Sequence, residues 1–233
     1  MKTLDFFLFG IYPYIAIAVF LVGSVVRLDY EPYTWKSGSS QFLRRRGMLF
    51  ASNAFHIGML ALLGGHAVGL LTPHFLYSAL GLSAETKQTV AMTAGGIFGV
   101  VCMLGMVFLV HRRLTDDRVK AAGSTMDTVI LLLLFIQLAV GLLTIPASAQ
   151  HHDATTMLAL AEWAQRILTF RGGAAELAAG TDPVFQAHLV IGLTILLLFP
   201  FSRLVHIWSV PLAYLGRRYQ LVRRRGPPVT RAG

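Results

Sequence analysis

Five long stretches of this sequence contain no lysine, arginine, aspartate or glutamate. They run from Phe6 to Val26, Gly47 to Thr72, Gln88 to Val110, Thr128 to Ala149 and Pro183 to Ser202. A bilayer core needs roughly 20 apolar residues per α-helix, and each stretch is about that long. Barrel strands would alternate in polarity, whereas these runs do not, and a helix satisfies its own backbone groups in lipid. We therefore predict an all-α integral membrane protein, a bundle of five transmembrane helices whose fifth helix continues to His206.

The composition agrees with a membrane protein, because 55% of the residues are hydrophobic, 13% are charged and the mean hydropathy is +0.63. Residues 1–233 are predicted to form a single membrane domain with a cytoplasmic tail over 207–233. The first apolar run is too long for the core of a signal peptide, and Lys2 is the only basic residue before it. We therefore expect this segment to be retained. Cys102 has no cysteine partner for a disulfide or a cluster and is predicted to be a packing residue.

The basic residues predict the orientation of the bundle. With five spans, all but four of the twenty lysines and arginines fall on one side. The exceptions are Lys2, Lys87, Arg166 and Arg171. The positive-inside rule then places the N-terminus outside, in the periplasm, and the C-terminus in the cytoplasm. The net charge of +9 is explained by topology, so no nucleic-acid partner is expected. The basic tail after Tyr214 would lie on the lipid bilayer or dock on a soluble partner.

The longest outer connection, residues 151–182, contains the segment MLALAEWAQRILTF. Its apolar residues recur at helical spacing. The segment is predicted to be a short helix, either interfacial or a lid that packs over the ends of the spans. The lid is the favoured interpretation.

Four histidines fall within or beside the spans, where an ionisable group without a partner costs free energy. His56 and His66 lie on the second helix, and His188 and His206 on the fifth. Because the two helices run in opposite directions, His66 and His188 should share one depth and His56 and His206 another. A six-coordinate haem takes two axial ligands from the protein, so two such pairs indicate two haem b groups.

The spacings along the two helices do not match. Ten residues give about 15 Å of rise and eighteen about 27 Å, so tilted haem planes and bending of the fifth helix at Pro200 must absorb the difference. One alternative is that the four are isolated histidines that hydrogen-bond to the backbone or to Ser and Thr across helix contacts. Another is a histidine-lined metal-ion transporter, which predicts acidic residues within the spans. The remaining histidines, at 74, 111, 151 and 152, are predicted to be surface residues.

Glycines surround the histidines of the second helix. Gly64, Gly65 and Gly69 flank His66, and Gly58 follows His56. They would let a flat macrocycle approach the backbone. They would equally suit helix packing, since Gly65 and Gly69 form a GxxxG pair.

Several stretches together resemble a known family. They are IYPYIA, YTWKSGSSQ, ASNAFHIGML, GHAVGLLTPH, AMTAGG, GLLTIPASAQH and LFPFSRLVHIWSVPLAYLGRRYQLVR. They resemble the gamma subunit, a dihaem cytochrome b, of membrane-bound respiratory nitrate reductase, over nearly the whole chain. The resemblance implies that His66 and His188 bind the iron of an outer haem and that His56 and His206 bind that of an inner haem.

The resemblance also implies a quinol site beside the outer haem, at the positions of Lys87, Gly65 and Gly69. A lysine there can donate to a quinone oxygen, although a lysine that anchors a helix in the headgroups is commoner. The family would oxidise menaquinol or ubiquinol and pass electrons through both haems to an iron-sulfur beta subunit and a molybdopterin alpha subunit, in a bacterial inner membrane. A dihaem subunit of another quinone-linked oxidoreductase is the nearest alternative.

Overall fold

The computed structural model describes residues 2–35, 47–150 and 153–209. In the described part five helices are long and apolar enough to cross a membrane, and no residue is in a β-strand. The first span joins α1 (Thr3–Phe6), a π-helical turn (Phe7–Ile11) and α2 (Tyr12–Tyr30); the others are α3 (Met48–Leu71), α5 (Ala84–Thr115), α7 (Thr125–Ala149) and α10 (Pro183–Leu198). The prediction of an all-helical chain with five such helices is confirmed.

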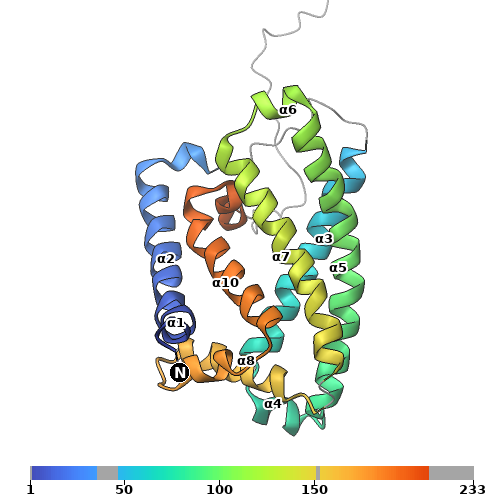
Figure 1. The fold of residues 1–233 in the computed structure, drawn as a ribbon. Coiled ribbons are helices and arrows are strands. Elements are labelled where there is room, and N and C mark those ends of the chain that lie inside the picture. Colours follow the sequence, from blue (N-terminus) through green and yellow to red (C-terminus); the bar gives the residue numbers. More distant parts are fainter. Residues whose placement is uncertain (1, 36–46, 151–152, 210–233) are drawn as a thin grey trace, which may run out of the picture.

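Short elements connect the spans or follow the last one. They are α4 (His74–Ala79), α6 (Asp117–Ala121), α8 (Thr155–Leu168), α9 (Ala174–Ala179), and 3-10 turns at Pro32–Thr34, Phe199–Phe201 and Arg203–Ser209. Helix α6 lies at one end of the bundle, whereas α4, α8 and the N-terminus lie at the other (Figure 1). Most of the predicted tail, residues 210–233, lies outside the described residues, as do His151 and His152.

Helix α7 begins before the uncharged run that predicted it. The Ser124 side chain accepts a hydrogen bond from the Asp127 N–H at 3.2 Å, and the Asp127 carboxylate accepts one from the Ser124 N–H at 2.9 Å. This reciprocal pair is a capping box, which satisfies two backbone donors that a helix start leaves open. The cap places the charged Asp127 in the first turn of α7. A search for uncharged residues therefore starts this span only after Asp127.

The long helices pack in the order α2, α10, α7, α5, α3. The closest approach is between α3 and α5, where a Cβ added at Gly58 would lie 2.6 Å from the Cβ of Cys102. One turn further along, a Cβ added at Gly105 would meet the backbone of Ala51 and Phe55. Cys102 is fully buried between the two helices, so its predicted packing role is confirmed. Gly58 serves this helix contact.

Helix α8 lies across the end of the bundle that holds the N-terminus (Figure 1). Its Trp163 is buried, and the indole N–H donates to the Phe9 carbonyl at 3.0 Å. The amide of Gln165 donates to the Leu70 carbonyl, at the end of α3, at 3.0 Å. Helix α8 therefore connects the ends of two spans through hydrogen bonds. This confirms the prediction that the segment is a lid that packs over the ends of the spans.

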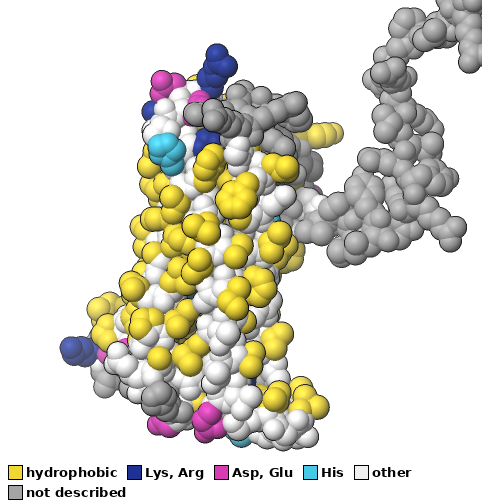
Figure 2. All heavy atoms as spheres, turned by 90° about the vertical axis from the view of Figure 1, so that its right-hand side faces the viewer, with side chains coloured by type: hydrophobic (Ala, Val, Ile, Leu, Met, Phe, Trp, Pro, Cys, Tyr) yellow, Lys and Arg dark blue, Asp and Glu magenta, His cyan; other side chains and the backbone are white. Residues whose placement is uncertain are grey.

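Apolar and charged side chains are distributed over the outer surface as a bilayer requires. One face shows apolar side chains over its middle and charged side chains at its ends (Figure 2). Large apolar residues such as Leu60, Val100 and Leu143 are more than half exposed in the isolated chain. Among the long helices of the described chain, α2, α3, α5 and α7 carry such exposed large apolar side chains, as expected where lipid replaces water.

The fifth span departs from the predicted continuous helix. Helix α10 ends at Leu198, and two 3-10 turns carry the chain to Ser209. Pro200 has no N–H for the helix ladder, and its ring would clash with the carbonyl of Leu196. A Cβ added at Gly23 would lie 2.8 Å from the Pro200 ring, so this turn packs closely on α2. The α-helical register predicted between His188 and His206 therefore does not hold beyond Leu198.

Candidate functional site

Helices α3 and α10, which carry His66 and His188, face each other without packing together. In the described chain, α3 packs along α5 and α10 packs between α2 and α7, but α3 and α10 share no comparable helix contact. The rings of His66 and His188 bridge this interval, with centroids 6.0 Å apart and planes inclined by 34°. The predicted pairing of these two histidines in space is therefore present in the structure.

The separation of the two rings suits a shared metal ion. Two imidazoles that bind one metal from opposite sides, each through a bond of about 2 Å, have ring centres about 6 Å apart. The 6.0 Å observed between His66 and His188 matches this arrangement. A haem iron takes its two axial ligands in this way.

Three of the four histidines have the same hydrogen bond. The Nδ1 atoms of His56 and His66 lie 2.7 and 2.8 Å from the carbonyl oxygens of Ser52 and Leu62, one turn earlier on α3. The Nδ1 atom of His206 contacts the Arg203 carbonyl at 2.5 Å. A metal-binding histidine typically donates its other ring N–H to such an acceptor, which fixes the tautomer and leaves Nε2 for the metal.

His188 lies in a different environment, against α7. Its Nε2 atom is 3.4 Å from the Gln137 side-chain nitrogen, while its Nδ1 atom and the Gln137 oxygen are buried and make no hydrogen bond within the described residues. A Cβ added at Gly141 would lie 2.8 Å from the ring. Gly141 thus allows this imidazole to sit directly on the backbone of α7. Neither Gln137 nor Gly141 was predicted from the sequence, although the two lie one turn apart on one face of the predicted fourth helix.

The glycines near His66 are not used for helix packing. A Cβ added at Gly64, Gly65 or Gly69 would have no described heavy atom within 4 Å. The GxxxG pair therefore contacts no neighbouring helix in the described structure. A broad, flat group can approach α3 along this stretch, as the haem interpretation requires.

His56 and His206 are not in ring contact within the described structure. His56 is exposed on α3, with the Phe55 ring beside it, and His206 lies on the 3-10 segment that follows α10. His56 lies in the half of α3 nearer α6. The assignment of both histidines to one haem stays a prediction. His74 and His111 are exposed, as expected for surface residues.

Lys87 lies on the first turn of α5, at the α8 end of the bundle. Its ammonium nitrogen is buried, makes no hydrogen bond to the described residues and sits 4.1 Å from the centre of the Tyr77 ring. The Tyr77 hydroxyl is likewise buried without a hydrogen-bond partner in the described chain. Burial raises the pKa of Tyr77 above its usual value. A headgroup anchor would extend into water, so this geometry favours a site of two polar donors.

Tyr77 was not predicted from the sequence. It lies on α4, where His74 contacts its ring from one turn earlier, with ring centroids 4.9 Å apart. The sequence signal that could have indicated Tyr77 is its helical spacing from His74, between Pro73 and Gly81.

The fold and the site together define a class of protein. It is a multi-pass membrane protein in which histidines on two apolar helices, α3 and α10, approach each other across an interval where these helices do not pack together. A metal-binding group held within the bilayer, rather than a soluble active site, is the chemistry that such an arrangement suits.

The comparisons with known proteins give the particular family. The family model described as "Nitrate reductase gamma subunit" matches residues 5–225. The chain is 56% identical to the respiratory nitrate reductase 1 gamma chain of Escherichia coli strain K12 over 97% of its own length and 100% of that protein. It is 34% identical to the nitrate reductase gamma chain of Bacillus subtilis strain 168, over 94% and 97%. The chain belongs to the nitrate reductase gamma subunit family, as its resemblance predicted.

Proposed function

We propose that this chain is the dihaem cytochrome b subunit of a respiratory nitrate reductase. His66 and His188 would hold the iron of an outer haem, and His56 and His206 that of an inner haem. The observation that carries the proposal is the pair of rings 6.0 Å apart between two spans that do not pack together. When bound, the haems would supply one-electron carriers between the two faces of the membrane.

The residues at the α8 end would bind and orient quinol. Lys87 and Tyr77 present a buried ammonium and a buried hydroxyl that lack hydrogen-bond partners in the described chain, and both can donate to a quinol oxygen. Gly65 and Gly69 would leave room for a flat ring beside His66, since neither has a described neighbour where a side chain would stand. Protons released here would leave on the α8 side.

The charge distribution supports one orientation. Of the ten lysines and arginines that the structure describes, six lie at the α6 end: Arg27, Arg112, Arg113, Arg118, Lys120 and Arg203. This end would face the cytoplasm of a bacterial inner membrane, and the α8 end would face the periplasm. Each electron crossing inward would work against the membrane potential by about 2.3 kcal/mol per 100 mV. The electron acceptor must therefore be strongly oxidising, and nitrate meets that requirement.

The names of the relatives support partner subunits, since each is a gamma chain of a nitrate reductase. Cys102, the single cysteine, cannot ligate an iron-sulfur cluster alone. We propose that an iron-sulfur beta subunit and a molybdopterin alpha subunit dock at the α6 end, with the basic tail among their contacts.

Optical spectra of membranes that contain the whole complex test the proposal. A menaquinol analogue should reduce b-type haem, and nitrate added afterwards should reoxidise it, whereas membranes without this chain should show neither change. If quinol reduces the haem but nitrate does not reoxidise it, the assignment to nitrate reductase is contradicted. An absence of b-type haem would contradict the cytochrome itself.

A further inference from the structure

The segment that carries His206 cannot hold its own conformation as an α-helix does. It follows the break at Pro200 and consists of 3-10 turns, whose hydrogen bonds have poorer geometry than those of an α-helix. The His206 ring is oriented locally by the Arg203 carbonyl. The position of Arg203 therefore decides where the imidazole lies.

Two neighbouring helices fix this segment through side chains. From α2, the Arg27 guanidinium donates to the carbonyls of Pro200 and Ser202 at 2.6 and 2.8 Å. From α7, the Asp127 carboxylate accepts a hydrogen bond from Arg203 Nε at 2.8 Å. Only the second contact reaches the residue whose carbonyl orients His206.

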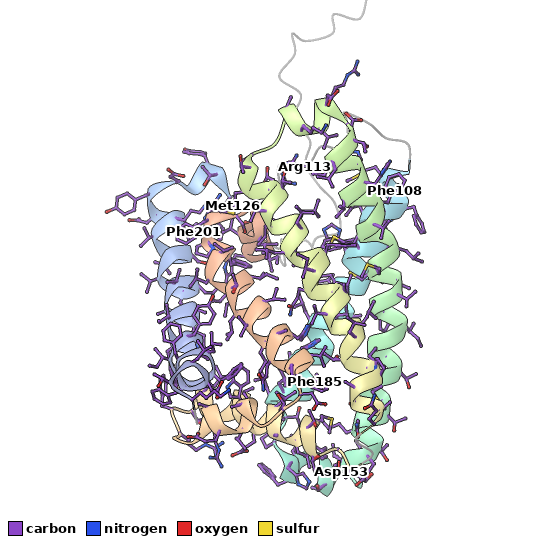
Figure 3. The ribbon with its side chains drawn as sticks, in the orientation of Figure 1. Phe108, Arg113, Met126, Asp153, Phe185 and Phe201 are labelled. Carbon is purple, nitrogen blue, oxygen red and sulfur yellow. The ribbon has the colours of Figure 1, made fainter. Side chains whose placement is uncertain are left out.

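Asp127 is itself held rigidly. Its Oδ2 atom accepts from the Ser124 N–H at 2.9 Å, and the Arg113 guanidinium lies 3.6 Å from the same oxygen. Arg113 also donates to the carbonyls of Val119 and Ser124 at 2.8 and 3.0 Å. Figure 3 shows Arg113 on α5 at the α6 end, where Met126 on α7 and Phe201 after α10 also lie.

The three charged side chains are largely removed from water, with exposed fractions of 9% for Arg113, 16% for Asp127 and 33% for Arg203. A buried ion pair adds little to stability over an apolar packing, but removal of one member leaves an uncompensated charge. Gly123 supports the same cluster, since a Cβ there would collide with the Arg113 guanidinium. Such a cluster specifies position more than it adds stability.

We propose that Asp127 is a positioning residue for His206, acting through Arg203 to place this imidazole at the inner haem. The inference rests on the proposed function, because it needs the inner haem. Removing the carboxylate charge should loosen the Arg203 segment and weaken inner-haem binding by about tenfold, the lower end of the range for partners of a metal ligand. The outer haem, held from α3 and α10 before the break, should be unaffected.

The test uses Asp127→Asn in the assembled complex. Asparagine keeps an oxygen that can accept from the Ser124 N–H, so the cap of α7 should survive. Asp117→Asn is the matched control, because Asp117 is 94% exposed and its one ion pair among the described residues is with Lys120. Arg203→Lys, which keeps the charge beside Asp127, should retain more inner haem than Arg203→Ala.

The readouts are haem content per chain and a potentiometric titration followed by electron paramagnetic resonance, with His206→Ala marking the inner-haem signal. Asp127→Asn should lose or shift that signal alone. An inner haem unchanged in content, potential and spectrum would overturn the inference, and so would equal loss of both haems. A wild-type chain without haem would instead overturn the proposed function, and the inference with it.

Discussion

Gly141→Ala should perturb the outer haem while it strengthens the helix that carries the substitution. Gly141 lies within α7, and a Cβ there would be 2.8 Å from Cε1 of His188. Ordinary contact begins at 3.4 Å, so the imidazole must move by about 0.6 Å. Metal–ligand distances tolerate changes of about 0.2 Å, so a displacement of this size cannot be absorbed in the bond.

The two effects of this substitution have opposite signs. Alanine in a helix interior is favoured over glycine by about 1 kcal/mol, so α7 itself should not weaken. Displacement of a ligand of the outer haem should reduce haem affinity by about 10- to 100-fold, as changes beside metal ligands typically do. Quinol oxidation should fall with it, because the proposed quinol site adjoins His66.

The assay is a redox titration of both haems in the purified complex, with haem content per chain. Gly96→Ala is the control, since a Cβ there would make only an ordinary 3.7 Å contact with Ile145. Gly141→Ala should lose or shift the outer haem alone, and Gly96→Ala should match the wild type. An outer haem that is identical in both variants would refute the contact-based reasoning.

Three further predictions follow from the same structure. His66→Ala should remove the outer haem and quinol oxidation but leave the inner haem, measured by haem content; equal loss of both haems would argue against the pairing. Lys87→Met should lower kcat/KM for quinol by about 10- to 100-fold, the effect of losing a charged hydrogen bond, at unchanged haem content; haem loss would point to a structural role. Trp163→Phe should leave the Phe9 carbonyl without its donor and destabilise the lid by about 1–3 kcal/mol, seen as a lower melting temperature in detergent, whereas Phe75→Leu at an exposed position on α4 should not.

The sequence predicted the membrane helices because lipid makes the strongest demand on composition. Runs of uncharged residues can be found without any knowledge of packing, and all five correspond to long helices. The exact ends could not be found in this way. Helix α7 starts at Thr125 because Ser124 and Asp127 cap it, and α10 stops at Leu198 because Pro200 interrupts the ladder.

The site was predictable only in part. Depth along two antiparallel helices was enough to pair His66 with His188, whose rings do meet. Depth could not place His206, because its segment consists of 3-10 turns that Arg27 and Asp127 hold through Pro200 and Arg203. Contacts between side chains far apart in sequence, such as Lys87 with Tyr77, depend on packing that helical spacing does not encode.

The most direct test of the central claim is a reduced-minus-oxidised optical spectrum of the purified complex, calibrated by extraction of haem and its ratio to this chain. The account predicts two b-type haems per chain, retained after treatment with a metal chelator. No b-type bands, or a metal that chelation removes, would contradict it and return the four histidines to metal-ion transport.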